Sequence, residues 1–210
     1  MDSKRLKDFI TKEFENNFWI LLVIMLFLTI GIILGNYMVK YMGNDNLKAL
    51  NDYLSVFLQG LKDENFSGKN LFIEAVRNNV IIIIIIWSCG FTILGTPVVL
   101  LINLVKGFTF GFSLAVILAA GGENSIVLSI LSLIPQNIIY IIGMVIISIY
   151  SVKTSLDKLK QKVFKVKSSE GGVTLANYLY CLLFVLLFMT IGFIVEAYIT
   201  PPAIKYVSGI

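Results

Sequence analysis

The sequence predicts an all-α, polytopic membrane protein, a bundle of five transmembrane helices. Of its 210 residues, 57% are hydrophobic and only 14% are charged, which lies outside the range of soluble domains. Five segments also hold about 20 mostly apolar residues each, the length that a helix needs to cross a bilayer. They are residues 18–39, 79–102, 104–121, 126–150 and 176–200. We therefore expect one integral membrane domain over residues 1–210.

The first span, 18–39, follows a charged lead and is not ended by a small-residue cleavage pattern, so we interpret it as a retained anchor. The chain has no histidine, and its two cysteines, Cys89 and Cys181, fall in different predicted spans. This pattern argues against a His- or Cys-liganded metal site and against a disulfide framework. We expect no metal and no cofactor.

Basic residues indicate the orientation of the helices. They gather before the first span, at Lys106, and in the linker 151–175. With five spans these regions share one side, which the positive-inside rule makes cytoplasmic. The N-terminus is then cytoplasmic, the loop 40–78 is external, and the lysines of the linker lie near the inner leaflet. The net charge of +4 needs no nucleic acid to explain it.

Lys106 also fixes the expected turn between the second and third spans. A turn at residues 95–97 would bury this lysine near mid-membrane, at a cost of about 2.5–3.5 kcal/mol. We therefore expect the turn at 103–107, with Lys106 at the inner interface and Pro97 kinking the second span. In the third span, Gly107 and Gly111 begin a stripe of small residues that predicts close helix packing, within the chain or in a homo-oligomer.

Two stretches outside the spans have a helical, amphipathic pattern. In the external loop the apolar residues recur at spacings of three and four: Leu47, Leu50, Leu54, Phe57 and Leu61. Packing on the protein itself or on the bilayer is the favoured interpretation of this seam, and docking of a partner helix is the alternative. The linker 151–175 repeats the pattern with lysines off the seam, which predicts a basic extension of the fourth helix on the inner leaflet.

Few polar groups lie inside the predicted spans. Pro135 should bend the fourth helix, and Gln136 and Asn137 then place amides about midway through the membrane, where they can bond to freed backbone groups or to another helix. Glu196 lies near the outer end of the last span, where we expect a shallow ion pair with Lys40 or Arg77. A structural role is favoured for the amides over a substrate or ion site, since amides do not act as acids or bases.

Three of these stretches carry a family resemblance. WSCGFTILGTPVVLLINLVKGFTFGF, SLIPQN and EAYITP together resemble the stage II sporulation protein M family of endospore-forming bacteria, nearly end to end. The residues that match the motifs of the family are Gly95, Pro97, Lys106, Gly107, Gly111, Phe112, Pro135, Gln136, Asn137, Glu196, Ala197, Tyr198 and Pro201.

The resemblance implies a mother-cell membrane protein of the septal and engulfing membrane, needed for forespore engulfment. It implies a non-enzymatic anchor that recruits or positions stage II sporulation proteins D and P, which cleave peptidoglycan. No catalytic residues are carried over. Leu54 and Phe57 are the candidate contact residues, and charged substitutions there should abolish recovery of D or P. A small-solute or ion transporter is the alternative function, and an intramembrane enzyme ranks last.

Overall fold

The structure is an all-helical bundle, which confirms the predicted fold class. The computed structural model describes residues 3–60, 68–119, 125–164 and 175–207, and within these ranges its regular elements are all helices. Five helical stretches are long and apolar enough to cross a membrane. They are Asn17–Lys40, Gly68–Cys89, Gly95–Ala119, Ile126–Lys162 and Leu175–Tyr206.

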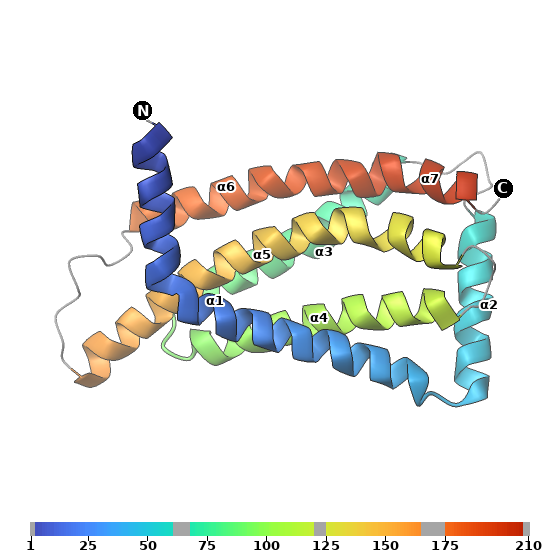
Figure 1. Cartoon of the computed structure of the whole chain (residues 1–210), viewed down its shortest axis with the longest axis horizontal. Helices are drawn as coiled ribbons and strands as arrows, with labels where there is room; N and C mark the ends of the chain where they lie inside the picture. The colour runs from blue at the N-terminus through green and yellow to red at the C-terminus, as the bar shows by residue number, and fades with distance from the viewer. Residues whose placement is uncertain (1–2, 61–67, 120–124, 165–174, 208–210) are drawn as a thin grey trace.

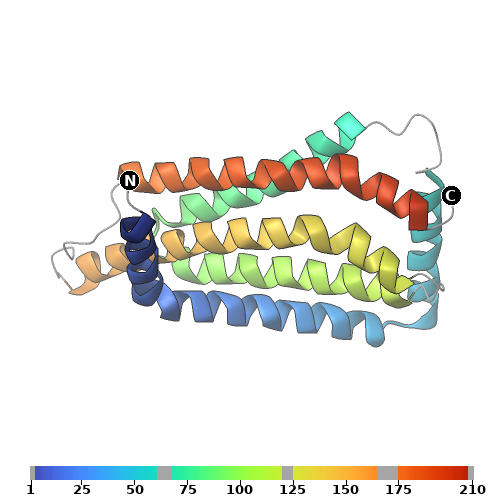
Figure 2. The same ribbon diagram turned by 45° about the horizontal axis from the view of Figure 1, so that its top comes forward.

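The long helices run side by side, and a shorter helix, α2, lies across one end of the bundle (Figure 1). In chain order the elements are α1 (Ser3–Lys40), α2 (Asn44–Gly60), α3 (Gly68–Cys89), α4 (Gly95–Ala119), α5 (Ser125–Phe164), α6 (Leu175–Ile194), the π-helical turn η1 (Val195–Ile199) and α7 (Thr200–Val207). Figure 2 shows α1, α4 and α5 stacked in that order, with α3 and α6 beyond α5. Since α5 contacts α1, α3, α4 and α6, it forms the centre of the bundle.

The most extensive helix contact joins α1 to α4, and glycines make it close. Gly31 and Gly35 of α1 face Gly107 and Gly111 of α4. A Cβ atom at any of the four would lie less than 3.0 Å from a backbone carbonyl oxygen of the opposite helix. Only glycine permits this approach, and close van der Waals contact is what holds helices together in lipid. The small-residue stripe of α4 is therefore used within the chain.

The turn between the second and third spans differs from our expectation. It lies at residues 90–94, so these spans are 68–89 and 95–119 instead of 79–102 and 104–121. Short backbone bonds close it, including Thr92 N–H to Cys89 O at 3.0 Å. The Oγ of Ser155 on α5 fixes it further by donating to Thr92 O at 2.9 Å and accepting from Thr96 N–H at 3.1 Å.

Two consequences follow from this shift. Pro97 is the third residue of α4 and does not kink a span, because the first turn of a helix has no use for the missing N–H. Lys106 lies midway along α4 and not at the inner interface. We expected Lys106 at the interface because a lone buried charge is costly. In the folded bundle, Lys106 has polar partners.

The predicted helix in the first loop is α2, Asn44–Gly60. Leu47 and Leu50 pack against a small apolar cluster that includes Val39 of α1 and Ala115 of α4, which supports the self-packing interpretation for this part of the seam. The side chains of Leu54 and Phe57, and residue 61 as a whole, lie outside the part that the structure describes. On another face of α2, Tyr53 and Val56 are 73% and 66% exposed.

The predicted extension of the fourth helix is present, since α5 continues to Phe164. Val152 is buried, and Leu156 packs against the main core. Lys158 donates to the carbonyl oxygen of Phe91 at 3.1 Å and lies 4.8 Å from the centre of its ring. This part of the extension is thus fixed on the 90–94 turn. Residues 165–174 of the linker lie outside the described ranges, and the orientation of the bundle stays a prediction.

Candidate functional site

Four polar side chains from four elements meet inside the bundle: Asn79 of α3, Lys106 of α4, Tyr140 of α5 and Glu196 of η1. We call them the central polar cluster. Lys106 Nζ donates to Asn79 Oδ1 at 3.0 Å, and Asn79 Nδ2 donates to Ala75 O at 2.9 Å. The bond to its own helix turns the amide so that its oxygen faces the ammonium group.

Tyr140 and Glu196 form the other half of the cluster. The hydroxyl of Tyr140, which is 3% exposed, donates to Glu196 Oε2 at 2.5 Å. Lys106 Nζ lies 5.8 Å from the centre of the Tyr140 ring, within the range of cation–π attraction. Lys106 and Glu196 therefore contact the same tyrosine, one at its ring and the other at its hydroxyl.

The cluster lies midway along the spans, a depth at which ionisable residues commonly have a function. Asn79 and Lys106 lie midway along their spans, where a lone charge costs about 2.5–3.5 kcal/mol on insertion scales. Ionisable residues at this depth face the bundle interior, pair with one another, and commonly mark proton or ion pathways. The arrangement places an acidic and a basic side chain beside one tyrosine, and it can fix four elements against each other.

Glu196 differs from its predicted setting. The last helix continues past Pro201 and Pro202 as α7 to Val207. Between α6 and α7 lies the π-helical turn η1, in which the N–H of Thr200 bonds to Val195 O, five residues back. The partner of Glu196 is Tyr140, not Lys40 or Arg77. Single π turns within α-helices occur often at functional sites, because the extra residue changes which side chains face inward.

Gln136 and Asn137 bond mainly to their own helix. Gln136 Nε2 donates to Ser132 O, and Asn137 Nδ2 donates to Leu133 O at 2.8 Å. Gln136 Oε1 also accepts from Thr200 Oγ1 at 3.3 Å, which joins α5 to α7. Thr200 follows Glu196 by four residues, so Gln136 lies one turn nearer the outer end than the Tyr140–Glu196 bond. This reverses the expected order, in which the amides lay deeper than Glu196.

Pro135 lies within α5, which remains one continuous helix from Ser125 to Phe164. Figure 2 shows α5 changing direction in its first part, the yellow segment that includes this proline. The first part of α5 contacts α7, and the bond between Gln136 and Thr200 forms there. Gln136, next to Pro135, is thus part of the contact between these helices.

Sequence reasoning missed Asn79 and Tyr140 and placed Asn103 in the wrong setting. Asn79 precedes an unbroken run of apolar residues, and Tyr140 lies one turn after Gln136. Both positions therefore had a weak signal in the sequence for a polar site within the spans. Asn103, expected in a turn, is completely buried in α4 and donates to Ser148 Oγ of α5 at 2.9 Å. A search for polar residues that recur at helical spacing on neighbouring spans would have identified these three residues.

The described residues also bear on metal binding. Among them, no group of three or more histidine, cysteine, aspartate or glutamate side chains is arranged to hold a metal ion. Cys89 and Cys181 are both free and partly buried. The central polar cluster is therefore the candidate site that the geometry singles out.

The fold and the cluster define a polytopic helical membrane protein with a polar site at mid-bundle. A family model described as Stage II sporulation protein M matches residues 23–201. The chain belongs to this family, and the match spans α2 and every residue of the cluster. It confirms the resemblance seen in the sequence and a role connected with sporulation. No curated protein and no solved structure gives a significant match.

Proposed function

We propose that the chain is a non-enzymatic membrane anchor that recruits or positions the peptidoglycan-remodelling enzymes of engulfment, stage II sporulation proteins D and P. It acts in the septal and engulfing membrane of the mother cell. The single observation that carries the proposal is the family match over residues 23–201. The fold supports it, because most of the described chain is spanning helix and α2 presents an exposed face at one end of the bundle.

The proposal is tested by recovering the tagged protein from sporulating cells in mild detergent. We expect proteins D and P to co-purify with the native chain. Replacing Leu54 and Phe57 by glutamate should abolish their recovery if the seam of α2 docks a partner. The matched pair is Tyr53→Glu with Val56→Glu, on the exposed face of α2. If only this second pair abolishes recovery of D and P, the contact lies on the exposed face. If D and P do not co-purify with the native chain, the proposal is refuted.

A small-solute or ion transporter is the second candidate, and the central polar cluster favours it. Transporters place ionisable groups and interrupted helices near the midplane, and here Glu196 lies on a π-helical turn beside Lys106 and Tyr140. Reconstituted vesicles test it. Proton or cation flux that disappears in Glu196→Gln, while the variant remains inserted and folded, would establish transport. Equal and negligible flux in both proteins would exclude it for the ions tested.

A further inference from the structure

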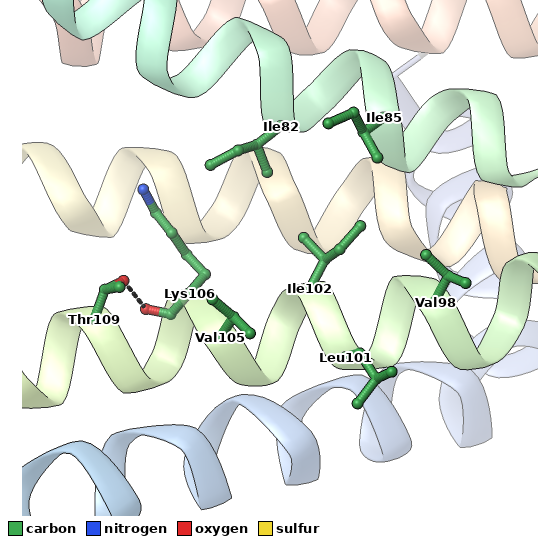
Figure 3. Close-up of a pocket in the computed structure, with 8 residues that line it drawn as sticks. All are labelled: Ile82, Ile85, Val98, Leu101, Ile102, Val105, Lys106 and Thr109. Atoms are coloured by element: carbon green, nitrogen blue, oxygen red, sulfur yellow. Dashed lines mark hydrogen bonds between the residues drawn. The ribbon is translucent and has the colours of Figure 1, made fainter. Parts of the chain in front are cut away.

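A crevice of about 580 Å³ opens between α3 and α4. Apolar side chains line it, Ile82 and Ile85 from α3 and Val98, Ile102 and Val105 from α4 (Figure 3). Ile85 and Val105 are 46% and 56% exposed, so the mouth of the crevice opens on the outer surface of the bundle, toward lipid. The α4 lining runs from Val98 to Thr109, about three turns or ~16 Å.

Lys106 lies at one end of this crevice. Figure 3 shows its side chain reaching from α4 toward α3. The ammonium group has three N–H donors, and within the described part of the chain Asn79 Oδ1 is its one hydrogen-bond acceptor. Lipid tails offer no acceptor at this depth, and unsatisfied donors are costly in hydrocarbon. An occupant that complements both the lining and Lys106 is apolar and carries an oxygen acceptor near mid-membrane.

We propose that the crevice binds a membrane-spanning helix of a partner protein, one that carries an amide or carboxyl side chain near the middle of its span. Apolar side chains of that helix fill the space between α3 and α4, and its polar oxygen accepts from Lys106. An acyl chain fits the apolar lining but adds no oxygen acceptor to the one that Asn79 provides and to the Tyr140 ring. Since polar side chains commonly join helices in membranes, the contact is both attractive and selective. This inference rests on the proposed anchor function and names the surface that performs it.

Photo-crosslinking in sporulating cells tests the occupant. A photoreactive amino acid replaces Val105 at the mouth of the crevice, or Leu183 on α6, which has the same exposure of 56%. We expect the probe at 105 to form an adduct whose crosslinked peptide lies in a spanning segment of another protein. The probe at 183 should give at least about tenfold less. Adducts to lipid alone, adducts to a second copy of this chain, or equal yields from both positions would overturn the proposal.

A blocking variant provides an independent readout. With the probe at Ile85, Val105→Trp should fill the crevice and lower the adduct yield at least about tenfold, and Leu183→Trp should leave it unchanged. Both residues are exposed, so equal membrane abundance of the two variants is expected and is measured first. An undiminished adduct in Val105→Trp would refute docking in the crevice. If proteins D and P co-purify equally with Val105→Trp, only this inference fails, whereas their absence from the native chain refutes the anchor function itself.

Discussion

Two faces of α4 hold the bundle together by different physical means. Toward α1, Gly107 and Gly111 bring backbone against backbone, and shape alone makes the contact. Toward α3 and α5, Lys106 reaches across to Asn79 and Tyr140, and an apolar crevice lies beside it. The first face uses no charge, and the second depends on polar contacts supplied by separate helices.

The difference teaches where this fold tolerates change. A contact made by shape responds to added volume and is indifferent to charge. A charged group at mid-membrane responds to the loss of its polar partners, because lipid cannot solvate it. The two faces should therefore respond to different substitutions.

The largest effect is expected for Glu196→Gln. The amide can still accept from Tyr140, but Lys106 then has no carboxylate near it at mid-membrane. We expect the free energy of unfolding in mild detergent to fall by about 3 kcal/mol, the insertion cost of a lone charge at this depth. Lys106→Met combined with Glu196→Gln should recover most of this loss, because no unbalanced charge remains. A double variant as unstable as the sum of the single changes would contradict charge pairing.

The shape-based face is broken by Gly107→Leu. The new side chain meets the backbone of α1 near Leu28 O, which no rotamer change relieves. We expect a loss of about 2–3 kcal/mol in the same unfolding measurement. Val105→Leu, on an exposed position of α4, serves as the control and should change stability by less than about 0.5 kcal/mol. Equal effects of the two substitutions would show that the helices are not in close contact at Gly107.

A smaller effect is expected for Tyr140→Phe. The ring remains beside Lys106, and only the hydroxyl that donates to Glu196 is removed. Loss of a hydrogen bond to a charged group should lower the free energy of unfolding by about 2 kcal/mol. Tyr180→Phe, at a position 70% exposed, is the matched control and should have no measurable effect. Unchanged stability of Tyr140→Phe would mean that Glu196 does not depend on this donor.

The smallest effect belongs to Thr200→Val, which removes the bond to Gln136 while keeping the shape of the side chain. Interhelical hydrogen bonds in membranes average about 0.6 kcal/mol, and we expect a loss of about that size. Thr190→Val, whose hydroxyl bonds only to its own helix at Leu187 O, is the comparison. A clearly larger loss at Thr200 than at Thr190, measured by thermal unfolding, would assign the contact between α5 and α7 an energetic role.

Much of the architecture was predictable, because it depends on local patterns. The apolar runs gave the spans, the spacing of Leu47 and Leu50 gave α2, and the small residues of α4 gave a close helix contact. The candidate site was predictable only in part. Glu196 and Lys106 were recognised as unusual, but they were assigned to opposite surfaces of the membrane, and Asn79 and Tyr140 were missed.

The sequence by itself determined the number of spans, the helix in the first loop and the family, since hydropathy, periodicity and motifs are properties of the chain. The tertiary structure alone decided where the charges lie. A lysine at mid-membrane is unfavourable when judged on its own, so sequence reasoning moved the turn to keep Lys106 at the surface. Partners from α3, α5 and η1 change that energy. Asn79 lies 27 residues from Lys106 in the sequence, and Glu196 lies 90 residues from it. Their approach exists only in the folded bundle.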